Sequence, residues 1–127
     1  MSFADLGDDR GSLIIHDNLT LPFEIKRIFY TYGASANKVR GGHANKNTKF
    51  ILVALTGRCI VTVKVGDRAE DIELSSPSEG LFLDRMVWKE IHSFSTDSTL
   101  LAICSEPYDP DEYIYDFNIY LTEVNNA

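Results

Sequence analysis

The chain has 127 residues, 44% of them hydrophobic and 24% charged, and its formal net charge is −7. This length and composition are those of one globular domain, which argues against a disordered chain, and the acidic balance argues against a nucleic-acid backbone as the main partner. No apolar run reaches the ~18 residues that span a bilayer, and the N-terminus lacks the order of a secretory signal. We therefore expect a single cytoplasmic domain over residues 1–127, with no membrane partner.

Short strands separated by turns are predicted for the first part of the chain. The D-D-R-G sequence at residues 8–11 predicts a turn, and the S-L-I-I-H sequence after it predicts a short strand with Arg10 at its entrance. Residues 23–32 alternate as in a strand, so that Arg27 lies on one face and both Tyr30 and Tyr32 lie on the other. A small polar loop then leads to Arg40.

The central part of the chain carries the strongest strand pattern. Residues 50–65 contain two nearly continuous apolar runs joined at Thr56 and Gly57, which predicts a hairpin in a sheet that is covered on both sides. A second turn is expected at Gly66 and Asp67. Further strands are predicted at residues 69–74, 81–83, 87–94 and 99–105.

Many short strands with turns between them and almost no helical periodicity predict an all-β fold, and a jelly-roll antiparallel β-barrel is our choice. One short helix is expected near the C-terminus, because Asp109 suits an N-cap, Pro110 the first helical position and Glu112 the third position after the cap. Its buried stripe would consist of residues spaced by four, namely Tyr113, Phe117 and Leu121.

The three histidines, His16, His43 and His92, restrict the chemistry that the chain can perform. A metal site of the cupin type needs two histidines at i and i+2, and here the second position holds Asn45, so we expect no metal. The two cysteines lie in apolar runs, where we expect them to be structural.

General acid–base chemistry centred on His43 remains. In an extended segment His43 and Asn45 point to the same face, and an imidazole with an unperturbed pKa near 6.5 suits proton abstraction at neutral pH. The alternative is a structural histidine bonded to a loop carbonyl, and the residues alone leave both interpretations open.

Six motifs together resemble one enzyme family. The motifs are D-D-R-G-S-L, P-F-E-I-K-R-I-F-Y, R-G-G-H-A-N-K, L-T-G-R-C, G-L-F-L and V-W-K-E-I-H-S-F-S. In register from about residue 9 to residue 120, they look like the cupin-type sugar 3,4-ketoisomerases of deoxysugar biosynthesis. The pairing of R-G-x-H-A with W-x-E-x-H-x-F-S is not generic cupin patterning.

This resemblance implies an enzyme that moves the keto group of dTDP-4-keto-6-deoxyglucose from C4 to C3. An aminotransferase would then make a 3-amino-3,6-dideoxy sugar for surface glycans such as lipopolysaccharide. It also implies a fold of the cupin type, no metal or other cofactor, and a homodimer that exchanges N-terminal strands around residues 12–15.

The resemblance further implies roles for individual residues. His43 matches the catalytic base, and Asn45 would donate a hydrogen bond to an oxyanion or hydroxyl. Tyr30 and Tyr32 would offer a stacking surface or a phenolic donor. The positive side chains expected on the substrate, mainly on its diphosphate, are Arg10, Arg27, Arg40 and Lys46.

Three residues depart from the family pattern. Asn45 stands where H-A-H-K has a second histidine, Lys89 stands where many relatives have histidine after the tryptophan, and Phe50 replaces a polar residue. An engineered substitution would explain Asn45 alone, whereas natural divergence explains all three. Asparagine cannot shuttle a proton, so a diverged site would use Lys89 or a tyrosine as the acid, act on a different keto sugar or with different stereochemistry at C4, or bind without catalysis. As the acid, Lys89 would need a depressed pKa, which burial beside Arg85 would provide.

Two other functions stay open at this point. A catalytically silent cupin that binds a nucleotide sugar is favoured by Asn45. An epimerase acting at C3 or C5 is disfavoured, because the required histidine–aspartate pair is not found. Strand parity places His92 on the face opposite Lys89, which favours a structural role for His92.

Overall fold

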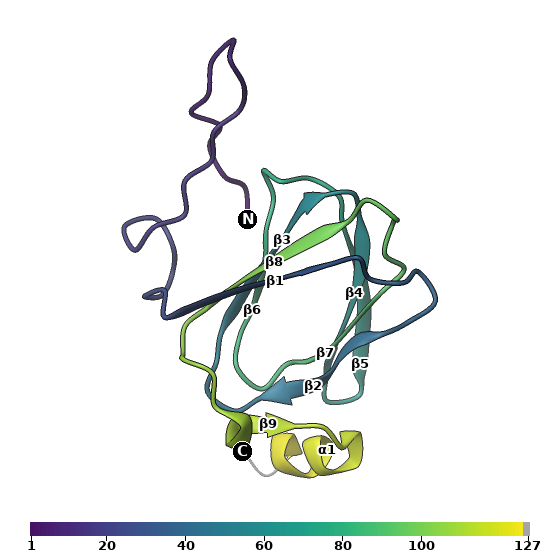
Figure 1. The fold of residues 1–127 in the computed structure, drawn as a ribbon. Helices are drawn as coiled ribbons and strands as arrows, with labels where there is room; N and C mark the ends of the chain where they lie inside the picture. The colour runs from purple at the N-terminus through teal and green to yellow at the C-terminus, as the bar shows by residue number, and fades with distance from the viewer. Residues whose placement is uncertain (126–127) are drawn as a thin grey trace.

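The computed structural model describes residues 1–125 and consists of two antiparallel sheets facing each other across a common interior (Figure 1). One sheet has the order β1 (Arg27–Tyr32), β8 (Thr99–Cys104), β3 (Phe50–Thr56) and β6 (Leu81–Leu83). The other has the order β5 (Arg68–Leu74), β4 (Cys59–Val65), β7 (Trp88–His92), β2 (Arg40–Asn45) and β9 (Tyr113–Ile114). This arrangement confirms the predicted all-β barrel of the cupin type.

Strand β3 is buried on both of its faces, as its continuous apolar sequence predicted. Phe50 and Leu52 point between the sheets and belong to the main core. Ile51 and Val53 point the other way, where the segment from Leu21 onward covers them. One face of β3 therefore lines the interior between the sheets, and this interior contains both apolar packing and a cavity.

The hairpin predicted at Thr56 and Gly57 is wrong, because β3 and β4 lie in different sheets. Strand β3 pairs with β6 and β8, whereas β4 pairs with β5 and β7. The two apolar runs are equally compatible with a hairpin and with a connection that crosses from one sheet to the other. The next turn was predicted correctly, since Val65 and Arg68 are register partners across Gly66 and Asp67.

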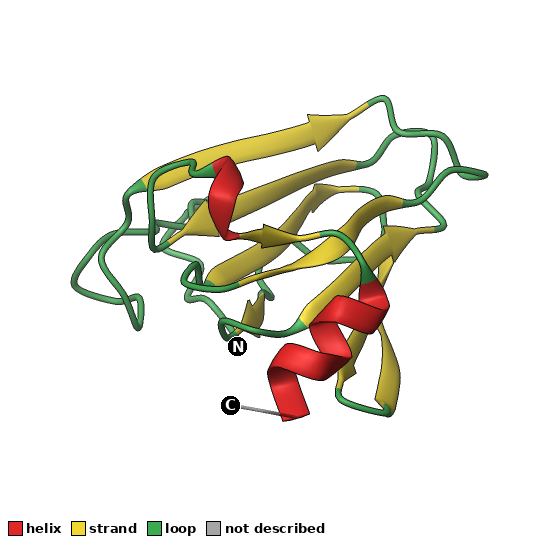
Figure 2. Ribbon diagram, turned by 90° about the horizontal axis from the view of Figure 1, so that it is seen from below, coloured by secondary structure: helices red, strands yellow, loops and turns green. Residues whose placement is uncertain are grey.

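The C-terminal helix begins later than predicted. Asp109 does cap a helical turn, but that turn is only the 3₁₀ helix η1 (Pro110–Glu112), and Tyr113 leaves it to pair with β2 as strand β9. The α-helix α1 (Phe117–Asn125) starts where the Asp116 carboxylate accepts hydrogen bonds from two backbone N–H groups (Figure 2). An available sheet edge beside β2 thus takes Tyr113 out of the predicted helical stripe.

Residues 1–3 are hydrogen-bonded to residues 78–80, and the N-terminal segment that follows them forms a loop that extends away from the barrel (Figure 1). No strand forms at residues 12–16 within the described single chain, and Leu13 and Ile15 are 54% and 49% exposed. The predicted strand is absent here because its residues face solvent rather than a sheet edge. Across residues 1–125, neither helix has the length and apolar character needed to cross a membrane.

Candidate active site

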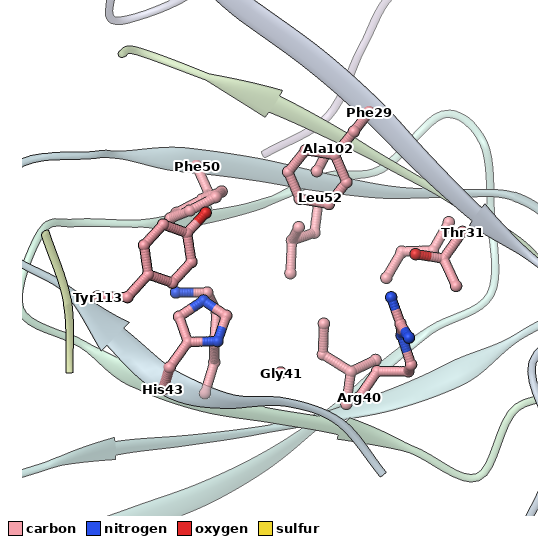
Figure 3. A pocket seen from close by; sticks show the side chains of 12 residues that line it. Phe29, Thr31, Arg40, Gly41, His43, Phe50, Leu52, Ala102 and Tyr113 are labelled. Carbon is pink, nitrogen blue, oxygen red and sulfur yellow. The ribbon is translucent and has the colours of Figure 1, made fainter. Parts of the chain in front are cut away.

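A cavity of about 180 Å³ lies between the two sheets (Figure 3). Its polar groups gather at two ends, with His43 and Tyr113 at one and Arg40 and Thr31 at the other. No carboxylate of the described residues lines it. The lining residues are Phe29, Thr31, Arg40, Gly41, His43, Phe50, Leu52, Lys89, Ile91, Leu100, Ala102 and Tyr113.

A bulge in β2 brings Arg40 and His43 into the same cavity. The register with β7 shifts between Gly41 and His43, and Gly41 and Gly42 have φ values of 78° and 72°. A Cβ atom at Gly41 would stand 3.0 Å from the Lys89 carbonyl oxygen, so this position needs glycine both for its conformation and for its close approach. The two glycines therefore direct side chains three residues apart into one space.

His43 is held as a neutral imidazole. Burial, with the nearby positive charge of Lys89, lowers the pKa of His43 to about 4. Its ring packs against Tyr113, with 4.7 Å between the ring centroids. A neutral imidazole facing a cavity is able to accept a proton at any physiological pH.

Lys89 enters the cavity from β7, as the resemblance to the cupin pattern implied, and is only 4% exposed. Burial lowers the pKa of Lys89 to about 7, with Arg27 adding to the effect and the Glu112 carboxylate opposing it. Burial is the predicted cause, but Arg85, which was expected beside Lys89, is not among the groups that shift its pKa. Arg85 is exposed and donates instead to the backbone carbonyl of Lys46.

The three departures from the family pattern form one contact cluster. Lys89 Nζ donates to Asn45 Oδ1 at 3.1 Å and lies 4.2 Å from the centre of the Phe50 ring. Asn45 is fully buried, and its Nδ2 has no hydrogen-bond partner within residues 1–125. The asparagine thus accepts from Lys89 and retains an unused donor, while the phenylalanine ring faces the ammonium group.

A buried carboxylate lies behind Asn45. The Glu112 carboxylate accepts hydrogen bonds from the Thr48 hydroxyl at 2.6 Å and the Thr48 backbone N–H at 3.0 Å. Burial would raise the pKa of Glu112, but the hydrogen bonds from the Thr48 hydroxyl and from the backbone N–H groups of Thr48 and Asn47 outweigh it and lower that pKa. Glu112 therefore supplies a fixed negative charge near Lys89.

Arg27 lies next to the cavity, where it does not itself form the wall. Its Nη1 donates to the Tyr113 hydroxyl at 3.4 Å, and its guanidinium lies 5.6 Å from the centre of the Tyr108 ring. Within residues 1–125 Arg27 forms no ion pair, and its buried Nε and Nη2 have no hydrogen-bond partner. Its positive charge is consequently uncompensated by any acidic side chain in contact with it.

The structure brings together His43, Asn45, Lys89 and Arg40 from the predicted set, with Arg27 beside them. Tyr30 and Tyr32 lie elsewhere, on the outer face of β1, where they are 63% and 73% exposed. There they share a second, shallower pocket with Arg40, and so remain next to the cavity entrance on that side. The alternation of residues in β1 predicted that both tyrosines lie on the face opposite Arg27.

Two predicted residues are remote from the cavity within one chain. Arg10 lies in the extended N-terminal segment and pairs with Asp8 at 2.7 Å. Lys46 is exposed, and its backbone N–H donates to the Glu112 carbonyl. His92 lies outside the cavity as predicted, with Nε2 2.8 Å from the Thr62 hydroxyl.

Sequence reasoning missed Tyr113 and Glu112 as site residues, because the helix predicted from Asp109 included both. The two-residue strand β9 gave no periodicity by which to recognise it. A possible signal of this part of the site was the cluster of three tyrosines at 108, 113 and 115. The buried stripe of the predicted helix includes only Tyr113, so it leaves the other two tyrosines unexplained. No group of three histidine, cysteine or acidic side chains able to hold a metal occurs in residues 1–125.

The site therefore combines a neutral base, a buried ammonium group and a phenol around a small space. Its volume is below the ~300–1,000 Å³ typical of pockets for drug-sized ligands, so it accommodates only one small part of a large ligand. The nearby cations favour a ligand that carries or develops negative charge.

Comparisons with known proteins point in the same direction. Residues 1–125 match the family model described as "FdtA: WxcM-like, C-terminal". TDP-4-oxo-6-deoxy-alpha-D-glucose-3,4-oxoisomerase from Aneurinibacillus thermoaerophilus is 38% identical over 98% of this chain and 93% of its own length.

Two solved structures are also similar over nearly the whole chain. A 3,4-ketoisomerase from Helicobacter canadensis has a TM-score of 0.94 and 38% identity, covering 98% of this chain and 94% of its own. A histidine-to-asparagine variant of the 3,4-ketoisomerase QdtA from Thermoanaerobacterium thermosaccharolyticum, in complex with TDP-4-keto-6-deoxyglucose, has a TM-score of 0.95 and 32% identity, covering 98% of this chain and 91% of its own.

Proposed function

Since this chain belongs to the FdtA family, described as WxcM-like, C-terminal, we propose that it moves the keto group of dTDP-4-keto-6-deoxy-D-glucose from C4 to C3. The protein is an isomerase, as are relatives similar to it over almost their full length. The observation that carries the proposed reaction is the neutral His43 imidazole beside the buried Lys89 ammonium group on the wall of one cavity.

The reaction requires a base at C3 and a donor for the developing enediolate. His43 removes the C3 proton and later returns it to C4. The Lys89 ammonium group donates to the carbonyl oxygen at C4, where negative charge develops. Asn45, through its unpartnered Nδ2, donates to a sugar hydroxyl or to the same oxyanion.

The nucleotide part of the substrate is too large for the cavity and lies outside it. Arg40 lines both the cavity and the pocket beside Tyr30 and Tyr32, so it is suited to bind the diphosphate where the ligand leaves the interior. The two exposed tyrosine rings offer a stacking surface to the base. Exposed Lys46 adds positive charge for the outer part of the nucleotide.

A binding module without catalysis is the second candidate, and Asn45 is the observation that favours it. An asparagine cannot relay a proton, and the solved complex of a histidine-to-asparagine QdtA variant holds the keto sugar. The two candidates differ in whether the bound sugar is turned over.

Proton NMR of dTDP-4-keto-6-deoxyglucose incubated with the protein in deuterated water tests the proposed reaction. We expect a 3-keto product, with deuterium at C4 to the extent that the proton held by His43 exchanges with the solvent before it is returned. Binding of the nucleotide without exchange or product would support the silent module instead. Exchange at C3 without product would mean that His43 acts as a base while the oxygen protons are not relayed.

We also propose that the protein acts as a homodimer in the cytoplasm, and that its product feeds an aminotransferase that serves lipopolysaccharide or related glycans. The free, buried Cys59 and Cys104 suit a reducing compartment. Exchange of residues 12–15 would cover the exposed Leu13 and Ile15. It would also carry Arg10 to the partner subunit, where its charge would face the substrate.

Replacing Leu13 by aspartate, L13D, is expected to convert the dimer to a monomer, because a charge would enter the apolar exchange contact. Light scattering coupled to gel filtration measures the mass of each species. The matched control is L19D, since Leu19 is 93% exposed in a turn and its variant should remain dimeric. A monomeric unmodified protein would contradict the proposed assembly.

A further inference from the structure

The phenol of Tyr113 has no role in the reaction as described above, although it lies beside the proposed base. Its ring packs against His43 and its hydroxyl reaches Arg27, while the side chain forms part of the cavity wall (Figure 3). A tyrosine in a site that handles protons on two oxygens is a potential proton carrier.

The contact with Arg27 determines where the phenolic proton points. A guanidinium group donates hydrogen bonds and accepts none, so the 3.4 Å contact uses a lone pair of the Tyr113 oxygen. The proton of the hydroxyl is therefore directed away from Arg27 and remains available to a ligand in the cavity. Tyr113 forms no other hydrogen bond through its hydroxyl among the contacts of residues 1–125.

Arg27 also has the charge needed to stabilise a phenolate. It forms no ion pair within the described chain, and two of its nitrogen atoms are buried without partners. The pair is thus arranged so that Tyr113 is able to give up a proton and regain it.

The other hydroxyl groups nearby are less suited to this role. The Thr31 hydroxyl lies at the Arg40 end of the cavity, away from His43 (Figure 3). Tyr108 and Tyr115 pack on Tyr113 but are each 65% exposed and do not line the cavity. Tyr113 is the tyrosine whose hydroxyl belongs to the space that His43 faces.

We propose that Tyr113 relays the proton between the two oxygens of the sugar, a role that rests on the isomerase function proposed above. In the first half-reaction His43 takes the proton from C3, the C3–C4 double bond forms, and the phenol gives its proton to the C4 oxygen. In the second, His43 returns its proton to C4, and the phenolate takes the proton of the C3 hydroxyl as the C3 carbonyl forms. All protons are conserved, and both side chains return to their starting states.

Substitution of Tyr113 by phenylalanine, Y113F, tests this role because it removes only the hydroxyl. We expect formation of the 3-keto product to fall by about 10²–10³-fold, as loss of a general acid–base group does, while exchange at C3 is less affected. The matched control is Y115F, which removes the hydroxyl of the stacked neighbour and should stay within about threefold of the unmodified enzyme.

Several results would overturn the proposal. Product formation by Y113F within threefold of the unmodified enzyme would do so, as would an equal loss in Y115F, which would indicate only a structural role for the tyrosine cluster. Thermal unfolding of each variant verifies that it is folded. If the unmodified protein makes no product, the proposed function itself fails, and that outcome is separate from a failure of Tyr113 alone.

Arg27 is a positioning residue in this scheme, and R27M gives an independent measurement. We expect kcat to fall at least tenfold with KM nearly unchanged, because the phenolate loses its stabilising charge while the substrate contacts remain. An increase in KM with unchanged kcat would assign Arg27 to substrate binding and would contradict its action through Tyr113.

Discussion

Substitution of His43 by glutamine, H43Q, is expected to lower kcat for isomerisation by roughly 10²–10⁴-fold. Glutamine preserves much of the side-chain volume but cannot accept a proton at neutral pH. Exchange of deuterium at C3 should disappear in parallel with product. Both rates are measured by proton NMR in deuterated water on the same sample.

The matched control for this variant is H92Q. His92 is also half-buried on a strand of the same sheet, but it lies outside the cavity and contacts Thr62. We expect H92Q to keep nearly full activity. Retention of more than a tenth of the activity by H43Q would contradict the assignment of the base.

The pH dependence of His43 follows from its buried position. The pKa of His43 is about 4, so the imidazole remains neutral and able to act as a base from neutral pH down to about pH 5. In the unfolded chain the pKa is near 6.5, and hence the unfolded state binds more protons between pH 4 and 6.5. The free energy of unfolding therefore rises with pH across this window as far as His43 contributes.

The fold was largely predictable because spacing and alternation report which residues face a sheet interior. The strands from Phe50 to Cys104 were placed correctly, since their turns carry clear glycine and polar signals. The sequence did not predict that the strands on either side of Thr56 and Gly57 belong to different sheets. A strand that is apolar on both faces has no local pattern that indicates which strand it pairs with. Pairing depends on contacts far apart in the sequence, which a local pattern does not contain.

The candidate site was predictable to the extent that strand parity holds. The cupin-like pattern predicted that Lys89 points into the barrel, parity then separated His92 from it, and His43 was identified from its motif. Tyr113 was missed because its position depends on the edge of β2, to which residues 113–114 add two pairs. A helix cap at Asp109 and a sheet edge compete for these residues, and the sheet edge prevails after a single helical turn.

The contact between Asn45, Lys89 and Phe50 gives a single physical explanation for three sequence departures. An imidazole at position 45 would be able to hold a proton itself, whereas the amide fixes Lys89 through Oδ1. The charge needed for catalysis has thereby moved from position 45 of β2 to Lys89 of β7, whose Nζ contacts Asn45 at 3.1 Å. This arrangement favours an active enzyme with a different donor over a silent one.

Lys89 is consequently expected to control the alkaline side of the pH profile. The free enzyme should lose kcat/KM as pH rises through about 7, because the ammonium group that stabilises the enediolate loses its proton. In K89M we expect kcat to fall about 10²–10³-fold and this alkaline limb to vanish, as for loss of one oxyanion donor. Initial rates between pH 5 and 9 measure both effects, and an unchanged alkaline limb in K89M would contradict the assignment.

The same substitution has an opposite effect on stability. The pKa of Lys89 is about 7 in the folded protein against 10.5 in an exposed lysine, so between these values the unfolded chain binds the extra proton and the free energy of unfolding rises with pH. The slope contributed by one such group approaches about 1.4 kcal/mol per pH unit. K89M should lose this slope and be more stable at pH 7, because a buried charge is replaced by an apolar side chain of similar length.

Urea unfolding at pH 7.5 and 9.5, at one protein concentration, measures the change in this slope. The control is K26M, because Lys26 is partly exposed. Equal slopes in K89M and the unmodified protein would mean that Lys89 remains charged in its buried position, and would remove the basis for its titration near neutral pH.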